Sequence, residues 1–403
     1  MKKTLLTLSF ASLLIAGHAQ VAPEIGCWIL NTSNATGYNN IPSNVQQVQY
    51  SNNNVYVSCT CIPGYDIGPW VGNPNTPSNQ NFVYKLTRTP QQNTGNPVNT
   101  PLGHIGVWTN GVSMFNAKDA MSYNNAGVWN QNAIVVEGAS FDTCLGHPAP
   151  NGEYHHHLNP HCLYDDHDST VHSPIIGYAF DGFPVYGAYA YANTNGTGPI
   201  TRMKSSYVMN TATTRANGPA VSAQYPLGYY IEDFTYVAGS GDLDEHNGRF
   251  CVTPEYPNGT YAYFVTLDAN LNAAYPYTVG PTYYGTVPSG NTGPGSGHNT
   301  VSEQVTTYTP SGVNEIASTL PVTIFPSPAS LNGTMNIFIS PVAINNITMT
   351  MFGVDGKEIR RTENMQPAVT YPIDLNGLPG GMYLVRFEYN GLVTTQKVMI
   401  AGE

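Results

Sequence analysis

Seven of the chain's eleven histidines lie between residues 147 and 172, and this segment is where the sequence is best equipped for chemistry. Only 10% of the residues are charged, so ionisable side chains are scarce elsewhere in the chain. Imidazole is the commonest protein ligand of transition metals. The histidine-rich segment therefore predicts a metal centre, most simply one of copper or zinc.

The three consecutive histidines at residues 155–157 have the spacing of a ligand pair carried by one strand. Alternate side chains of a strand face the same side, so His155 and His157 are predicted to point together and His156 to point away. A His-x-His pair supplies two imidazoles to one metal and leaves room for ligands from other loops.

The flanks of this run supply the other predicted ligands. Asp142 and His147 precede it, and His172 follows it. Cys144 and Cys162 enclose it, and we expect them to form a disulfide that draws the flanks together. The six cysteines of an exported chain favour disulfides, up to three here, over thiolate metal ligands, which are the alternative.

Other interpretations stay open. Histidines among tyrosines could form a buried hydrogen-bond network that only stiffens a loop-rich core. The acidic loop at residues 165–168 could bind Ca²⁺, although its spacing fits no EF-hand. The carboxylates at residues 242–245 could do the same, or Arg249 could neutralise them in a structural turn. Asp181, in an apolar aromatic setting, is expected to bond backbone amides in a turn, with a site carboxylate as the alternative.

Short strands joined by turns must position these side chains, and the sequence predicts a mainly β protein. Residues 20–287 form an irregular, loop-rich β domain, with strand character at residues 55–57 and 261–266. Residues 288–320 are rich in Gly, Ser, Thr, Asn and Pro, which predicts a flexible linker. Residues 321–403 contain evenly spaced apolar runs that predict a small, Ig-like β-sandwich.

Charge and targeting signals predict an exported protein that does not bind nucleic acid. The formal net charge is −11, and the few Lys and Arg residues are scattered, whereas phosphate binding needs clustered cations. Residues 1–19 combine a basic start, an apolar run and small residues before Gln20, which is the pattern of a secretory signal peptide. No later apolar stretch has the length that a membrane-spanning helix needs.

The C-terminal tail resembles the type A sorting domain of the type IX secretion system of Bacteroidota. The motifs that carry this resemblance lie at residues 324–329, 352–357, 378–385 and 395–400. The resemblance implies export across the outer membrane with the secretion machinery as partner, removal of the tail, and release or attachment at the cell surface. A carbohydrate-binding or adhesive sandwich is the alternative, but the tail contains no Trp to stack on a sugar.

Residues from about 100 to 287 resemble the YHYH domain family of exported proteins. The matching motifs lie at residues 111–116, 142–147, 154–157, 172–187, 241–245, 247–250 and 253–257. His156 stands where the second motif tyrosine is expected, and His246 where a cysteine often follows the acidic pair. The second departure suggests a different disulfide pattern, in which Cys251 could take part. The resemblance implies an extracellular setting but no reaction.

Three functions are compatible with the sequence. The first is a secreted or surface-displayed module that binds copper or zinc. The second is a metal-dependent extracellular enzyme, either a hydrolase or a copper oxidoreductase, with Tyr154 as a redox or acid–base neighbour of the metal. The third is a structural or adhesive protein whose histidines are core residues. A serine hydrolase is disfavoured because no Gly-x-Ser-x-Gly motif is present.

Overall fold

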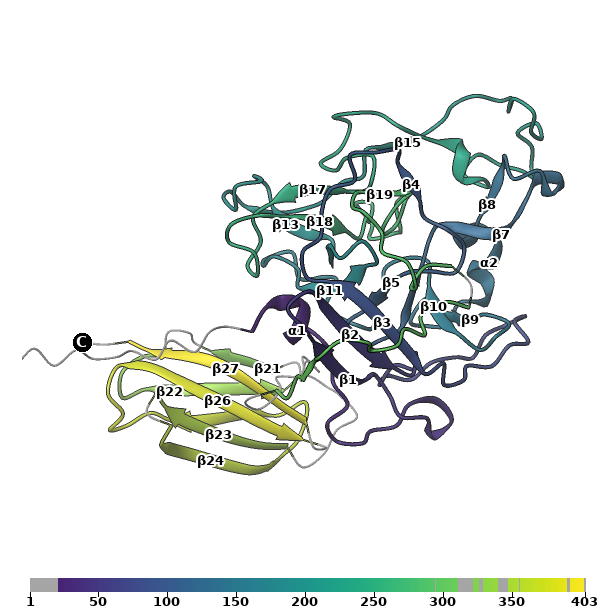
Figure 1. Ribbon diagram of the computed structural model, residues 1–403. Helices are drawn as coiled ribbons and strands as arrows, with labels where there is room; N and C mark the ends of the chain where they lie inside the picture. Colours follow the sequence, from purple (N-terminus) through teal and green to yellow (C-terminus); the bar gives the residue numbers. More distant parts are fainter. Residues whose placement is uncertain are drawn as a thin grey trace, which may run out of the picture.

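The computed structural model describes residues 21–293, 295–310, 322–325, 329–339, 347–354, 356–389 and 392–401. The predicted signal peptide at residues 1–19 lies outside the described residues. The chain is mainly β, as the sequence predicts, with many small sheets and two short α-helices among the described residues (Figure 1). None of the described helices combines the length and apolarity that crossing a bilayer requires.

An eight-stranded mixed sheet is the centre of the larger domain. In spatial order its strands are β17 (Gly248–Cys251), β18 (Thr260–Phe264), β12 (Pro184–Tyr186), β11 (Ile175–Ala179), β5 (His104–Trp108), β6 (Ser113–Phe115), β10 (Tyr154–His156) and β9 (His147–Pro148). Both faces of the sheet are buried. Val107 and Tyr178 pack into one core, and Trp108 and Ile176 pack into another on the opposite face. Strands buried on both faces do not show an alternation of apolar and polar residues.

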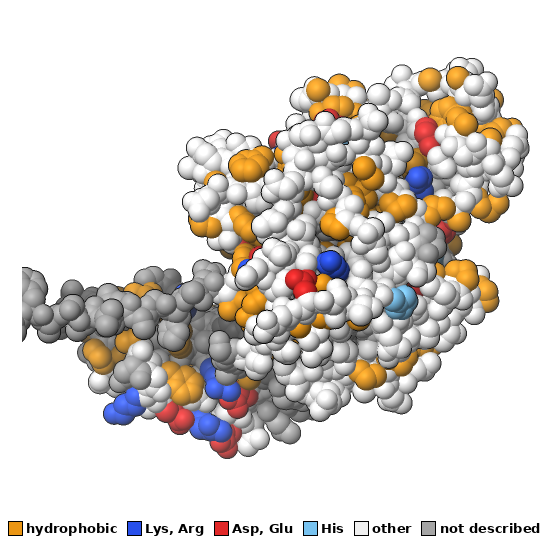
Figure 2. Space-filling view, viewed as in Figure 1, with side chains coloured by type: hydrophobic (Ala, Val, Ile, Leu, Met, Phe, Trp, Pro, Cys, Tyr) orange, Lys and Arg blue, Asp and Glu red, His pale blue; other side chains and the backbone are white. Residues whose placement is uncertain are grey.

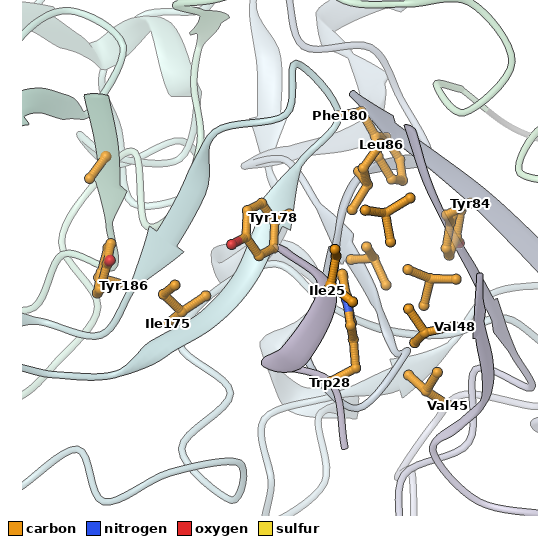
Figure 3. Packing of buried hydrophobic residues seen from close by; sticks show 14 of the residues in the cluster. Ile25, Trp28, Val45, Val48, Tyr84, Leu86, Ile175, Tyr178, Phe180 and Tyr186 are labelled. Atoms are coloured by element: carbon orange, nitrogen blue, oxygen red, sulfur yellow. The ribbon is translucent and has the colours of Figure 1, made fainter. Parts of the chain in front are cut away.

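A second sheet covers one face of the first. Its strands, in spatial order, are β20 (Thr306–Thr307), β1 (Val45–Tyr50), β2 (Asn54–Cys59) and β3 (Phe82–Thr87). Figure 3 shows the core between the two sheets, where Val48 and Tyr84 face Tyr178 and Phe180 and where Trp28 also packs. Burial of this many large apolar side chains fixes the central sheet and the strands at its edges.

Short hairpins and helices surround these two sheets. The hairpins pair β7 (Lys118–Ser122) with β8 (Asn130–Asn132), β13 (Tyr189–Tyr191) with β14 (Ile200–Arg202), β15 (Tyr207–Met209) with β16 (Phe234–Tyr236), and β4 (Val98–Asn99) with β19 (Thr282–Tyr283). The helices are α1 (Pro23–Gly26) and α2 (Ala133–Glu137), with 3₁₀ turns at Tyr38–Asn40, Tyr123–Asn125, Gly138–Ser140 and Ile231–Asp233. Helix α2 lies beside strands β9 and β10 (Figure 1).

The C-terminal β region has its own core and fits the predicted Ig-like sandwich. One sheet contains β21 (Val322–Phe325), β22 (Thr334–Ile339) and β25 (Thr370–Asp374); the other contains β24 (Glu358–Met365), β23 (Ile347–Gly353), β26 (Gly381–Tyr389) and β27 (Leu392–Ile400). Alternate residues of β26 are buried, including Val385 and Phe387. Charged side chains are sparse on the visible face of the larger domain and gather on this smaller one (Figure 2).

The described part of the Gly- and Ser-rich segment, residues 288–310, forms hydrogen bonds with the larger domain. Asn291 is 1% exposed, donates to Lys85 O at 2.6 Å and accepts from Lys85 N at 3.0 Å, so its amide replaces a neighbouring strand. Strand β20 pairs with β1. These bonds give partners to backbone N–H and C=O groups at the edges of the sheet that would otherwise have none. Residues 311–320 lie outside the described residues.

Asp181 is the turn-forming acid that its apolar setting suggested. It is fully buried and accepts hydrogen bonds from the backbone amides of Phe183 and Gly285 and from the hydroxyl of Tyr263. Burial raises its pKa from the ordinary value of 3.8 to about 6, because desolvation outweighs these bonds.

Replacing Asn291 by Ala tests whether the segment of residues 288–310 stabilises the domain. The substitution leaves the N–H and C=O of Lys85 without their amide partner, so the free energy of unfolding should fall by about 1–3 kcal/mol. Chemical denaturation measures the change. Asn195→Ala is the control, because Asn195 is exposed and bonds only Thr197. Equal stability of the two variants would mean that the segment is not held to the sheet.

The raised pKa of Asp181 predicts a pH-dependent contribution to stability. Between pH 4 and 6 the folded protein keeps a proton that the unfolded chain releases, so the free energy of unfolding falls as the pH rises through this window. Relative to Asp181→Asn, wild-type protein should lose up to about 3 kcal/mol between pH 3 and pH 7. Denaturation at a series of pH values measures this difference, and a constant difference would contradict it.

Candidate metal centre

The last two strands at one end of the central sheet bring three of the predicted ligands together. His147 in β9 lies opposite His155 in β10, and His157 follows β10 directly. The predicted alternation holds, because the Nε2 atoms of His155 and His157 are 3.1 Å apart. His156 faces the other side and packs edge-on against Trp108 in the core. All three convergent histidines are nearly buried, at 3–4% exposure.

A carboxylate that the sequence did not single out completes the cluster. Glu137, the last residue of α2, places Oε2 at 2.9 Å from His147 Nε2 and at 3.5 Å from His157 Nε2. The four potential donor atoms of Glu137, His147, His155 and His157 all lie within 4.8 Å of one another. The only sequence signal for Glu137 is that it is an isolated acid in the apolar run of residues 133–137.

Hydrogen bonds fix the tautomers of His155 and His157. His155 Nδ1 lies 3.0 Å from the carbonyl oxygen of Glu153, and His157 Nδ1 lies 2.6 Å from that of Asn116. A backbone carbonyl can only accept, so each Nδ1 must carry the proton and donate it. In a neutral ring the Nε2 atom is then a bare lone pair, and these two lone pairs face each other.

For His147 the partner of Nδ1 is a hydroxyl instead of a carbonyl. This Nδ1 lies 2.7 Å from Ser140 Oγ, and that hydroxyl also lies 2.8 Å from the carbonyl of Glu137. When Ser140 Oγ accepts from His147 Nδ1, His147 Nε2 is a lone pair directed at the Glu137 carboxylate; in the other tautomer Ser140 donates to Nδ1 and Nε2–H donates to that carboxylate at 2.9 Å. Metal-bound histidines commonly donate from their second ring nitrogen, as in the first of these arrangements.

Ionisation of the cluster follows from burial. Desolvation lowers the pKa of His147 and holds that of His155 well below the usual range, so both rings stay neutral. Burial acts to raise the pKa of Glu137, whereas hydrogen bonds from His147 and His157 lower it in the states where those rings carry a proton on Nε2. With all three Nε2 atoms deprotonated, four electron-rich acceptors converge on one point. A proton could relieve one of these repulsions, whereas a divalent cation relieves all of them.

The structure does not bring Asp142 to this cluster. Both of its oxygens are occupied, because Asp142 accepts hydrogen bonds from the Tyr154 hydroxyl, from the indole of Trp70 and from three backbone amides. Its role is to anchor the loop that leads into β9. Tyr154, considered above as a neighbour of the metal, points toward Asp142 and is buried on the side opposite His155.

His172 also lies elsewhere. Its Nδ1 is 2.7 Å from the carbonyl of Ser173, and its ring packs against Tyr186 and Tyr191. His172 is near the histidine run in sequence but not in space, because between residues 157 and 175 the chain crosses from β10 to β11, three strands away in the central sheet. Within the described residues, no second group of three or more potential metal ligands converges, and this includes the acidic loops considered for calcium.

Cys144 and Cys162 form a disulfide, which is the pairing expected from the sequence. The bond ties the loop before β9 to the segment after the histidine run. The other four cysteines are free thiols, so the expectation of up to three disulfides reduces to one, and Cys251 does not take part. No cysteine belongs to the convergent cluster of potential ligands in the described chain.

A pocket of about 1050 Å³ opens onto the cluster. The side chains of Glu137, His147, His155 and His157 form part of its wall. Phe115 stacks on His155 with 3.8 Å between ring centroids. The rest of the wall includes Val71, Pro74, Leu102, Lys118, Asp119, Val136, Pro148, Pro150 and Glu153. An ion held by the four ligands would therefore be accessible to a small molecule.

Two comparisons with known families agree with this organisation. Residues 83–275 match the family described as YHYH protein, and residues 323–401 match the secretion system C-terminal sorting domain. Both resemblances drawn from the sequence are thereby confirmed. The comparison with curated proteins found no match. All four residues of the convergent cluster lie within the YHYH region, and β1, β2 and β20 extend the folded domain beyond it at both ends.

Replacing Asp142 by Ala tests its role as the anchor of the loop before β9. The substitution leaves several buried donors without an acceptor, so the free energy of unfolding should fall by about 3 kcal/mol or more. Asp168→Ala is the control, because Asp168 is only half-buried and bonds only Thr170; it should change stability by less than about 0.5 kcal/mol. Denaturant titration compares the two, and similar values would exclude the proposed anchor.

Proposed function

We propose that this chain is a secreted or surface-displayed protein whose YHYH domain binds a transition-metal ion through Glu137, His147, His155 and His157. The observation that carries the proposal is which nitrogen of each histidine ring donates a hydrogen bond and which one is left as a lone pair. The Nδ1–H groups of His155 and His157 are committed to carbonyl acceptors, so their Nε2 lone pairs face a common point together with His147 Nε2 and the Glu137 carboxylate. A core histidine network without metal would pair donors with acceptors, which disfavours the purely structural alternative.

Copper and zinc are the ions that suit this donor set best. Three imidazoles and one carboxylate match the preference of both, whereas Ca²⁺ takes six to eight oxygen ligands. Ligands on a tetrahedral zinc ion lie roughly 3.3 Å apart, given metal–nitrogen bonds of about 2.0–2.1 Å. Three of the six donor separations, at 2.9, 3.1 and 3.5 Å, bracket that spacing, and all six lie within 4.8 Å.

The pocket favours a metal-dependent enzyme as the second candidate function. A structural metal site is usually closed by protein, whereas these ligands form the wall of a space of about 1050 Å³. Bound zinc would supply activation of water for hydrolysis, and bound copper would supply oxidation chemistry. The chain's own contribution is to hold four donors in fixed positions and to surround the substrate with an apolar wall.

The C-terminal match supports export. We propose that residues 1–19 direct the chain across the inner membrane. The sorting domain, from about residue 321, would then engage type IX secretion machinery of a Bacteroidota cell and be removed at the surface. In this proposal the loop-rich domain of residues 20–287 keeps the bonded segment up to residue 310 after export.

Metal analysis of the secreted protein, produced without a polyhistidine tag, tests the metal site. We expect about one equivalent of copper or zinc per chain in wild-type protein. The double variant His155→Ala/His157→Ala should lose it, with affinity reduced by roughly 100-fold or more, because even residues behind the ligands change affinity by 10- to 100-fold. Elemental analysis and isothermal titration with Zn²⁺ measure both quantities.

His167→Ala is the matched control, because His167 belongs to the same segment but is exposed and lies outside the cluster. It should retain full metal content. Glu137→Gln should weaken binding while leaving the fold intact, since the glutamine side chain has nearly the same size. Absence of stoichiometric metal from wild-type protein in copper- and zinc-supplemented medium would contradict the proposal, as would equal binding by the double variant.

A further inference from the structure

The three histidine ligands lie inside the loop that the disulfide closes. Cys144 and Cys162 are 18 residues apart in the chain, and His147, His155 and His157 all lie between them. The other four cysteines are free thiols, so within the described chain no second disulfide holds this loop. A change at this one bond therefore acts on the strand pair that carries the ligands. The inference that follows rests on the proposed metal site.

Cys144 also lies on the connection between two of the ligands. Residues 138–146 join Glu137, at the end of α2, to His147, at the start of β9. β9 is the last strand of the central sheet, and its two residues pair with β10. A strand of two residues at the end of a sheet has few hydrogen bonds of its own, so its position depends on the loop before it.

The segment after the histidine run has other anchors. Leu158 is 6% exposed and packs in an apolar cluster. Asn159 donates to Asp166 at 2.6 Å and accepts from the hydroxyl of Tyr164 at 2.8 Å. Strand β10 itself pairs with β6 as well as with β9. Loss of the disulfide therefore loosens the side of the site formed by α2 and β9 more than the side formed by β10.

One half of the disulfide is open to solvent. Cys162 is exposed, whereas only 3% of the surface of Cys144 is exposed. A small thiolate therefore attacks the sulfur of Cys162, because exchange requires direct contact with a sulfur atom. The new S–S bond forms to Cys162, and the electron pair of the broken bond goes to the sulfur of Cys144, which takes up a proton. A second thiolate then attacks the added sulfur, which releases a small-molecule disulfide and the thiolate of Cys162.

We propose that Cys162 is a site of thiol–disulfide exchange that controls the metal centre, so that small thiols lower its affinity for metal. In the oxidised protein the disulfide keeps α2 and β9 against β10. In the reduced protein β10 stays in place, and the position of His147 depends on the hydrogen bonds of Asp142 and Ser140 alone. The same ligands then bind the ion less tightly and release it more readily.

Zinc titration of the full-length chain before and after reduction tests the proposal. A phosphine is the suitable reductant, because thiols bind zinc themselves. We expect the affinity for zinc to fall about tenfold, which is the size of effect that groups supporting metal ligands commonly have. The near-ultraviolet circular dichroism should remain that of a folded protein. The variant Cys144→Ala/Cys162→Ala is the matched control, since it should bind zinc like reduced wild type and should not respond to the phosphine.

A double-mutant cycle identifies the ligand that the disulfide controls. In the His147→Ala background, loss of the disulfide should change zinc affinity by less than about threefold, because the ligand that it positions is already absent. In the His155→Ala background the same loss should still lower affinity about tenfold. A disulfide that acted only on overall stability would have equal effects in the two backgrounds, and that result would overturn the proposal.

Brief treatment with glutathione, followed by alkylation and peptide mass spectrometry, locates the point of attack. The mixed disulfide should be found on Cys162, and an adduct on Cys144 instead would contradict the assignment.

The remaining outcomes separate this inference from the metal site itself. Failure of the oxidised protein to load zinc would overturn both proposals. Full loading with an affinity that reduction leaves unchanged or raises would overturn the control by thiols alone. Loss of the near-ultraviolet signal together with zinc would also overturn it, because the disulfide would then support the whole fold.

Discussion

The proposed metal site depends on which ring nitrogen carries the proton in each of the three convergent histidines. The Nδ1–H groups of His155 and His157 are each held by a backbone carbonyl, and Ser140 Oγ can accept from Nδ1–H of His147. Neutral His155 and His157 therefore cannot turn a donor toward the centre of the cluster. The buried Nε2 atoms and the Glu137 carboxylate therefore repel one another unless a cation lies between them.

The surrounding fold keeps that arrangement from relaxing. His155 is carried by β10, which is paired with β6 on one side and with β9 on the other, so the strand cannot rotate its side chains away. Asp142 and the Cys144–Cys162 disulfide fix the loop that delivers His147. A pre-formed set of ligands binds metal without a large ordering cost, which is why rigid supports matter as much as the ligands themselves.

The sequence predicted the features that follow from local geometry. The two-residue period of a strand was sufficient to place His155 with His157 and to turn His156 away, and the motifs of the tail and of the YHYH region identified both domains. It missed Glu137, whose proximity depends on a long-range contact between α2 and strands β9 and β10. It also grouped His172 with the cluster because the two are near in sequence. Composition predicted a flexible linker at residues 288–320 and gave no sign that the side chain of Asn291 supplies bonds that a strand would otherwise make.

X-ray absorption spectroscopy of the secreted protein, loaded with one equivalent of zinc, tests the central claim most directly. The account predicts only nitrogen and oxygen neighbours at about 2.0–2.1 Å, together with the outer-shell scattering of three imidazole rings. A sulfur neighbour at about 2.3 Å would instead indicate a cysteine ligand. Scattering from fewer than two imidazoles would mean that the three lone pairs do not hold the ion, and the proposed centre would be contradicted.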